Sequence, residues 1–437
     1  MLTVHYLLSL HMIDKALLLK TRELSDQLVA LQTPIRILDA INWDKQIKEE
    51  FFRQKCQKNP LIDRAYYQQR DLGFVPSELR QAFSTLQRNI INQLGQLNPI
   101  AQYMGKMCSE YKTVLSMLEY RGTPEFHDLS VELFGHPKDL FHAGEPSLTE
   151  LANMLERPLK NLLIADILPD DPKNIAASDA VRILSEQVNA SMVGINVEVM
   201  LSDGIVSDAA AGANNIKLNK DVKFSQRELD ILEVHEGWIH VGTTQNGLAQ
   251  PYLTCLSKGT PSSTVTQEGL AVLTEIITLK STPRRLSKLV NRIQAVTKVI
   301  DGAEFVDIYR DYVAQGLSQD ESYTLAQRVF RGSTPTGLPF TKDIAYIKGF
   351  VLVYNLIRVA IQLGRIDQLP LLLVGKISID DFRLITQLHS LGVIESPKFV
   401  PPHFKDLRGL ATWLSFGRFI GDLSFEQLEN DYKPLFL

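Results

Sequence analysis

Two histidines and a glutamate lie close together in the segment HEGWIH, as His235, Glu236 and His240. Neutral imidazoles are common zinc ligands, and a carboxylate beside them can take a proton from water held by the metal. The familiar pattern in zinc peptidases is HExxH, which is one residue shorter. We therefore expect a zinc (Zn2+) site here, although two histidines on one helix also occur as plain surface or core residues.

The five-residue spacing of the two histidines constrains the helix that carries them. In a regular α-helix, residues four apart lie about 40° apart around the axis, whereas residues five apart lie about 140° apart. Both imidazoles can reach one metal ion only if the helix is locally widened, as in a π-helical segment with i→i+5 hydrogen bonds. Gly237 lowers the resistance to that change. The spacing predicts such a distortion between Leu232 and Val241.

A third ligand is available from two glutamates further along the chain. In peptidases of the gluzincin type, a glutamate on a following helix completes the metal site. Glu268 lies 28 residues after His240, and Glu275 lies seven residues further on, on the same face of a helix. One of the two carboxylates can bind the metal while the other holds a ligand histidine. Two histidines and one glutamate leave the fourth position open, as in catalytic sites.

The remaining sequence indicates a mainly helical α+β fold. Apolar residues at helical spacing predict N-terminal helices over 13–31, 34–57, 76–94 and 99–120. We expect residues 1–120 to form a helical region, packed as one unit with a zinc metallopeptidase catalytic domain over 121–437.

A small β-sheet is expected before the HEGWIH helix. Residues between 193 and 222 alternate with period two around the segment SDAAAGA, which predicts two or three short strands. Such strands could pair with an extended substrate or form a plain structural hairpin. Ser225 and Glu228 have the spacing of a capping box, so a helix should begin there. The next helix should begin near Thr266 and stop at 282–283.

Composition excludes several classes of protein. The net charge of −4 and the absence of a dense basic stripe argue against a nucleic-acid or anionic-membrane partner. The three cysteines contain no CxxC pair, which favours a reducing compartment. We interpret the N-terminus as the start of a helix and not as a signal peptide, and expect no apolar run of the ~18–20 residues that a membrane span needs. The expected location is the cytoplasm.

Four blocks of the sequence resemble the QEGLA-motif family. Its bacterial members are known as flavohemoglobin expression-modulating QEGLA motif proteins, and its animal branch includes the microtubule-associated tyrosine carboxypeptidase. The blocks are RGTPEF at 121–126, HEGWIH with QNGLAQP at 245–251, TQEGLAVLTE at 266–275, and the pair RVFRG at 328–332 and FTKDIAYIKG at 340–349. Together they span roughly residues 120 to 360.

The resemblance implies a zinc metallopeptidase fold and a carboxypeptidase activity. It matches His235, His240 and Glu268 to the metal ligands and Glu236 to the catalytic glutamate. Glu275 is then left to hold a ligand histidine. The substrate would be a peptide or protein C-terminus.

Further residues near the family blocks are candidates for two remaining roles. Tyr346 and Tyr252 could stabilise the oxyanion, or could be ordinary buried tyrosines. Arg328, Arg331 and Lys342 could bind the terminal carboxylate of the substrate, because cations suit that group. The alternative for these cations is structural ion pairing, for example with Asp343.

Two other functions remain open at the level of sequence. One is a non-catalytic regulatory or binding protein that keeps a peptidase fold. The other is a zinc endopeptidase or small-molecule hydrolase that uses the same site.

Overall fold

The computed structural model describes residues 15–164, 168, 171–421 and 432–436. The described residues are mainly helical and contain one three-stranded sheet, in agreement with the expected mainly helical α+β class. The expected helix start within residues 1–14 lies outside the described residues.

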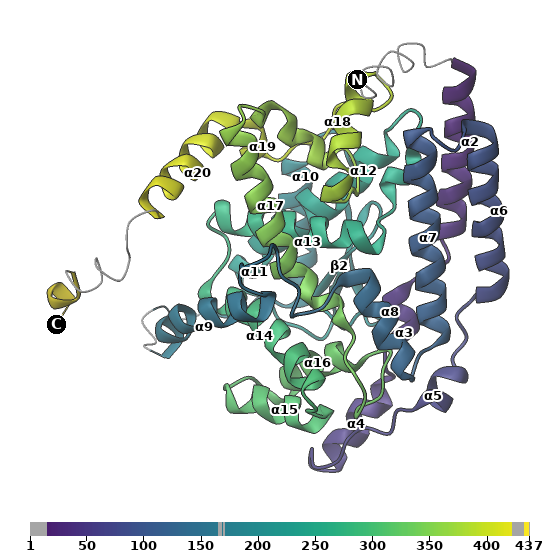
Figure 1. Ribbon diagram of the computed structural model, residues 1–437. Coiled ribbons are helices and arrows are strands. Elements are labelled where there is room, and N and C mark those ends of the chain that lie inside the picture. Colours follow the sequence, from purple (N-terminus) through teal and green to yellow (C-terminus); the bar gives the residue numbers. More distant parts are fainter. Residues whose placement is uncertain (1–14, 165–167, 169–170, 422–431, 437) are drawn as a thin grey trace.

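Three long helices run side by side along one edge of the molecule (Figure 1). They are α2 (Lys15–Gln32), α6 (Pro76–Leu94) and α7 (Pro99–Glu119), and all three were predicted within a few residues. Proline at the first turn of α6 and α7 suits a helix start, because the missing N–H would have no helical partner there. Their apolar faces share one core cluster with residues as distant as Leu414, so the N-terminal helices pack directly on the rest of the chain.

The prediction of one helix over 34–57 was wrong. The segment forms two short helices, α3 (Ile37–Ile41) and α4 (Lys45–Arg53). Asn42 is extended at the end of α3, and the buried Trp43 donates a hydrogen bond from its indole to the hydroxyl of Tyr67 at 2.7 Å. The tertiary contact of Trp43 therefore replaces a turn of helix that local periodicity favoured.

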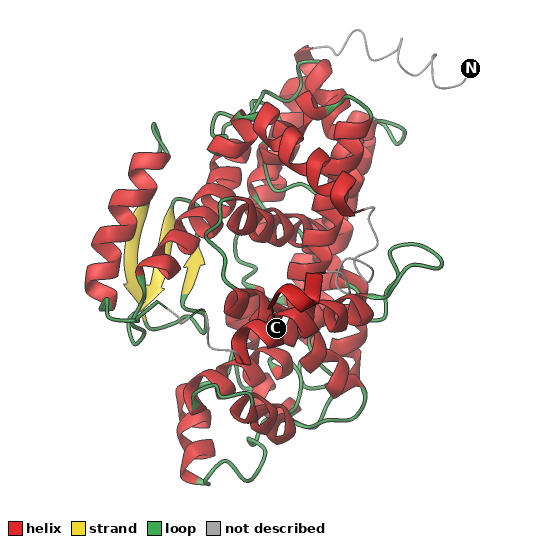
Figure 2. Ribbon diagram, turned by 90° about the vertical axis from the view of Figure 1, so that its left-hand side faces the viewer, coloured by secondary structure: helices red, strands yellow, loops and turns green. Residues whose placement is uncertain are grey.

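The sheet lies at one side of the helical body (Figure 2). Strands β1 (Glu198–Ser202) and β3 (Asn215–Asn219) pair in parallel, and β2 (Ala209–Ala211) pairs with β3 in antiparallel orientation. The strand order β1-β3-β2 places β2 at an edge. The sheet shares a core cluster with α10 (Ala177–Ser191) and with residues of the HEGWIH segment, which fixes its position beside that segment.

Two helices cross closely at the centre of the molecule. They are α13 (Pro261–Ile277) and α17 (Ala345–Gln362). A Cβ atom at Gly349 would lie 1.9 Å from the carbonyl oxygen of Val265, and one at Gly269 would lie 2.1 Å from the carbonyl carbon of Gly349. Only glycine permits this approach, which brings the backbones of two family blocks into contact.

Helix α17 also corrects an expectation about apolar segments. Among the described residues, the segment Thr341–Gln362 has the length and apolar composition that a membrane span would need. The sequence-based expectation that no segment approaches this length was therefore wrong. In the fold, one face of this helix packs against α13 in the core.

The remaining helices complete the body around these elements. Those that bear on the site are α8 (Pro124–Phe134), α11 (Gln226–Leu232), α12 (Gly242–Leu248), α14 (Pro283–Ile300), α16 (Gln319–Phe330) and the 3-10 turn η4 (Thr341–Ile344). The others are α5 (Arg64–Gln68), α9 (Leu148–Ile164), α15 (Phe305–Ala314), α18 (Phe382–Ser390), α19 (Pro402–Lys405), α20 (Leu407–Gly421), η3 (Thr254–Ser257), η5 (Ile366–Leu373), η6 (Ile379–Asp381) and η7 (Lys433–Phe436).

Candidate metal centre

The HEGWIH segment lies in a π-helix, η2 (Glu233–Val241), which confirms the predicted distortion. It follows α11, whose start carries the predicted capping box of Ser225 and Glu228. The widened turn brings the rings of His235 and His240 to a centroid separation of 4.9 Å. A regular helix would have pointed these two imidazoles in different directions.

Neighbouring side chains hold the π-helix in place. Gly237 packs against α10 so closely that a Cβ atom there would lie 3.2 Å from a methyl carbon of Val188. The glycine thus serves close packing as well as backbone freedom. The indole of Trp238 donates to the hydroxyl of Ser191 at 2.9 Å, and the hydroxyl of Thr244 donates to the backbone carbonyl of His240 at 2.7 Å.

Glu268 completes a group of three converging ligand atoms. Its Oε2 lies 3.5 Å from His235 Nε2 and 3.7 Å from His240 Nε2, and all three atoms lie within 4.8 Å of one another. Atoms that bind a tetrahedral zinc ion at about 2.0–2.1 Å lie about 3.3–3.4 Å apart, so the group fits such an ion. Glu268 Oε2 is buried and accepts no hydrogen bond. An unpartnered buried carboxylate oxygen is costly unless a cation occupies the space in front of it.

The charges around Glu268 favour its ionised form. Burial opposes ionisation, but Lys342 and the two histidines outweigh burial and hold the pKa of Glu268 well below its usual range. The Nζ atom of Lys342 lies 3.2 Å from Glu268 Oε1. The two histidines lie beside the other oxygen of this carboxylate, Oε2. Lys342 therefore orients the carboxylate and leaves Oε2 free for a metal.

Glu275 holds His235 from behind. Its Oε1 lies 2.6 Å from His235 Nδ1, and the guanidinium of Arg285 donates to the same carboxylate at 2.9 and 3.1 Å. Burial raises the pKa of Glu275, but Arg285 and His235 outweigh burial and lower it to about 2. A carboxylate on Nδ1 fixes the ring and directs Nε2 towards a metal. This is the supporting role that the sequence left open to either glutamate.

The helix that carries both glutamates begins earlier than expected. Thr260 and Ser263 cap α13, which starts at Pro261 and not near Thr266. The spacing from Glu268 to Glu275 still places both carboxylates on the face that meets η2. Gln267 of the same motif accepts a hydrogen bond from the Thr243 hydroxyl at 2.7 Å, which joins α13 to α12.

Glu236 lies on the half-exposed side of the centre. Its Oε2 accepts a hydrogen bond from the backbone N–H of Ala211 at 2.9 Å. Ala211 is the last residue of the edge strand β2, so the sheet is joined directly to the carboxylate that the sequence assigned as general base. This arrangement places the edge of a strand beside the site. A strand edge in that position is what pairing with an extended substrate would need.

Arg328 and Arg331 are buried and lie beside Asp343. The Arg328 guanidinium donates to both oxygens of Asp343 at 2.6 and 2.9 Å, and Arg331 lies 3.6 Å from the same carboxylate. Burial disfavours the Asp343 charge, but the surrounding arginines hold the pKa of Asp343 well below its usual range. The structure thus contains the ion pairing that the sequence gave as an alternative. Carboxylate binding by either arginine stays a prediction.

The two candidate tyrosines lie in different surroundings. Tyr346 is stacked at 6.4 Å from His235, with the guanidinium of Arg292 over its ring at 4.5 Å and Lys342 at 5.6 Å. Tyr252 is half-buried against the large helical core cluster. Within the part of the chain that the structure describes, no hydrogen bond or ring contact joins Tyr252 to the three ligand residues. The roles proposed for both tyrosines stay predictions.

Two residues beside the centre carry no local signal in the sequence. Arg285, which secures Glu275, lies on the next helix, α14. Lys376 lies more than 100 residues after Glu268, and burial lowers its pKa to about 8 although the charges of Glu236 and Glu268 act to raise it. Only the folded chain brings these side chains close to the candidate metal ligands.

The chain was compared with known proteins. The sequence profile of a family described as microtubule-associated tyrosine carboxypeptidase matches residues 49–422, which is most of the chain. The match confirms the resemblance that the four sequence blocks indicated, and the family's name points to a carboxypeptidase-like activity. A search of curated proteins found no match.

Proposed function

Because the chain belongs to the microtubule-associated tyrosine carboxypeptidase family, we propose that it is a zinc-dependent carboxypeptidase. The observation that carries this proposal is the convergence of His235 Nε2, His240 Nε2 and Glu268 Oε2, with Glu236 on the exposed side. The succession of a small sheet, the HEGWIH helix and a glutamate on a following helix, α13, also supports a gluzincin-like assignment.

We assign the metal-binding role to His235, His240 and Glu268. When bound, zinc would polarise the scissile carbonyl and acidify a water molecule. The side chains of His235 and Glu268 are each held by a further contact. Glu275 contacts Nδ1 of His235, and Lys342 contacts Oε1 of Glu268. Both contacts leave the candidate ligand atoms, Nε2 and Oε2, free. A ligand set of this kind favours metal binding without rearrangement of the side chains.

We assign the general-base role to Glu236. The Ala211 N–H holds Oε2 and leaves Oε1 to accept the proton of the attacking water. Glu236 would then pass that proton to the nitrogen of the leaving residue. Ala211 ends the edge strand β2, and the other backbone groups along that edge could pair with a substrate in extended conformation.

Tyr346 is the better-placed candidate for the oxyanion. It lies on the His235 side of the centre, and the cations of Arg292 and Lys342 lie over its ring. A hydroxyl donor near the scissile carbonyl would stabilise the developing charge. Tyr252 remains a second candidate on sequence grounds.

Matched peptides test the proposal. Protein supplied with zinc would be incubated with one peptide as its free acid and as its C-terminal amide, and the products followed by mass. Glu236→Gln provides the control for contaminating peptidases. Loss of single terminal residues from the acid alone is the expected result. Internal fragments, or equal cleavage of both peptides, would assign an endopeptidase, and no cleavage would favour the regulatory alternative.

A further inference from the structure

Three arginines and one aspartate form a buried cluster beside Tyr346. Arg292 lies on α14, Arg328 and Arg331 lie at the end of α16, and Asp343 lies in η4. None of these four residues is more than 9% exposed. Arg328 and Asp343 are among the charges that act on Arg292, so the three elements bring their charged groups into one place.

The cluster carries more positive charge than its carboxylate balances. Asp343 faces three guanidinium groups, which leaves an excess of two positive charges. Both Asp343 oxygens accept hydrogen bonds from Arg328, whereas Arg292 forms no ion pair within the described part of the chain. Burial and the neighbouring Arg328 lower the pKa of Arg331 to about 10 and also lower the pKa of Arg292. The guanidinium groups therefore repel one another where water screens them poorly.

Several N–H groups of the cluster have no acceptor. Nε and Nη1 of Arg292 and Nε of Arg331 are buried and donate no hydrogen bond to any described residue. Arg121 is a buried arginine with a different environment, because its Nε, Nη1 and Nη2 each donate to a backbone carbonyl. A buried donor without an acceptor is costly, and more so when the group is charged. The cluster is therefore suited to receive an anion.

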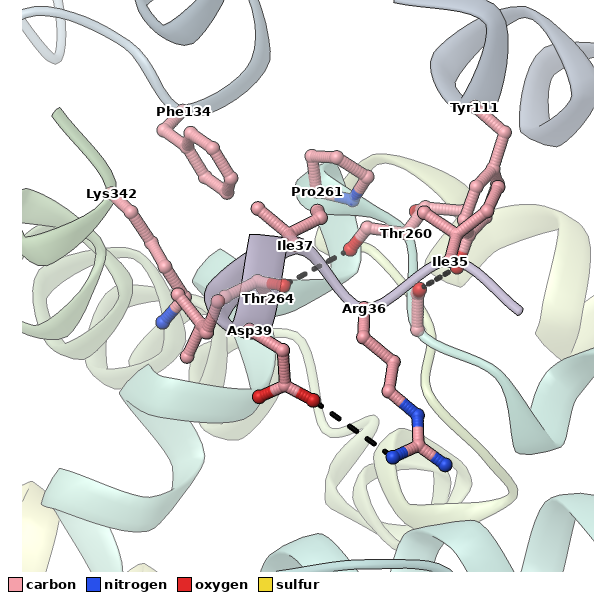
Figure 3. Close-up of a pocket in the computed structure, with 12 residues that line it drawn as sticks. Ile35, Arg36, Ile37, Asp39, Tyr111, Phe134, Thr260, Pro261, Thr264 and Lys342 are labelled. Carbon is pink, nitrogen blue, oxygen red and sulfur yellow. Dashed lines mark hydrogen bonds and ion pairs between the residues drawn. The ribbon is translucent and has the colours of Figure 1, made fainter. Parts of the chain in front are cut away.

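The surroundings of the cluster favour a small ion of low charge. A halide accepts hydrogen bonds from any direction, whereas an oxyanion such as phosphate carries more charge that must be stripped of water. A cavity of about 340 Å³ lies at the start of α13 (Figure 3). Lys342 lines this cavity, but the three arginines are not among its described lining residues. The arginines thus belong to a closed site that suits an ion and not a larger ligand.

We infer that a halide ion, which is chloride under physiological conditions, binds in this cluster as the acceptor for the free N–H groups of Arg292 and Arg331. The Arg292 guanidinium lies 4.5 Å from the ring of Tyr346, and Tyr346 stacks on His235. The ion would therefore also steady Tyr346 beside the candidate metal centre. The anion site is independent of the proposed carboxypeptidase function, whereas an effect of chloride on peptide cleavage rests on that function.

Bromide locates the ion directly. Crystals of the unaltered, zinc-supplied protein would be grown without halide and soaked in sodium bromide, and anomalous diffraction would be recorded at the bromine edge. The expected result is a peak beside the guanidinium nitrogens of Arg292 and Arg331. Peaks confined to the protein surface would mean an adventitious ion only and would overturn the inference.

Thermal unfolding tests the site in solution. Sodium chloride would replace sodium methanesulfonate, which has a larger anion, at constant ionic strength. An ion that binds only the folded chain predicts a saturable rise in Tm of about 1–3 °C. Arg292→Met should abolish this rise. An unchanged Tm in the unaltered protein, or the same rise in Arg292→Met, would contradict the site, and if Arg292→Met did not fold, the bromide position would decide.

Arg121→Met is the matched control for these measurements. Arg121 is about as buried as Arg292, but its guanidinium is fully bonded to backbone carbonyls. The variant should lower Tm in both salts and keep the chloride-dependent rise. Loss of that rise in Arg121→Met would show that the rise reports general stability and not an ion in the cluster.

Peptide cleavage tests the link to Tyr346. The rate at saturating peptide should fall several-fold when methanesulfonate replaces chloride, and Arg292→Met should cleave at the same rate in both salts. Equal rates in the unaltered protein, with bromide bound in the cluster, would overturn the link to Tyr346 and leave the anion site. Bromide in the cluster without any cleavage in either salt would support the anion site and count against the carboxypeptidase proposal alone.

Discussion

Replacement of Glu275 by glutamine tests how the centre is supported. The carboxylate is fully buried and accepts hydrogen bonds from Arg285 at 2.9 and 3.1 Å, and it lies 2.6 Å from His235 Nδ1. Glutamine has nearly the same shape and can still accept one hydrogen bond from His235. It cannot neutralise Arg285, whose half-buried guanidinium would then face an uncharged amide group.

The structure sets the size of the expected effects. Removal of one partner from a buried ion pair typically costs about 3–5 kcal/mol of unfolding free energy. Loss of an outer partner of a ligand histidine typically weakens metal binding about 10- to 100-fold. We therefore expect Glu275→Gln to be less stable by about 3 kcal/mol and to bind zinc at least 10-fold more weakly.

Two measurements separate these effects. Urea unfolding gives the stability, and competition with a chelator at low temperature gives the zinc affinity of the folded variant. Arg285→Met is the matched control, because it breaks the same ion pair and leaves Glu275 on His235. It should lose comparable stability and much less zinc affinity. If folded Glu275→Gln held zinc as tightly as the unaltered protein, the positioning role of Glu275 would be refuted.

Three further predictions follow from the same structure. Glu236→Gln should retain about one zinc per chain and lose activity, whereas Glu268→Gln should lose its zinc. Elemental analysis measures the zinc content, and identical content in both variants would contradict the division of roles. Gly349→Ala should lower the free energy of unfolding by about 1–3 kcal/mol or more, because its Cβ atom would clash with α13. In the control Gly417→Ala in α20, the new Cβ atom meets no neighbouring atom, so urea unfolding should show an unchanged or higher stability. Burial lowers the pKa of His403 from 6.5 to about 4, so the unfolded chain binds its proton first and stability falls as the pH drops from 6.5 to 4, by about 3 kcal/mol. His403→Phe should flatten this part of the pH–stability curve measured by thermal unfolding, and an unchanged slope would mean that His403 is not buried as a neutral ring.

The sequence by itself determined the features that depend on local backbone geometry. The HExxxH spacing required a widened helix, because five residues in a regular α-helix turn through about 500° and separate the imidazoles. The π-helix Glu233–Val241 meets that requirement. Ser225 and Glu228 marked the start of the preceding helix for the same kind of reason, since a capping box involves only neighbouring residues.

Only the tertiary structure decided which side chains support the centre and from where. Sequence spacing placed Glu268 and Glu275 on one helix face, but the packing of α13 against η2 put Glu268 at the imidazole Nε2 atoms and Glu275 behind His235. Arg328 and Arg331 form ion pairs with Asp343. The Lys376 side chain lies against Gly259, just before the start of α13. These contacts join residues far apart in the chain, so they depend on how complete helices pack, and no local pattern encodes them.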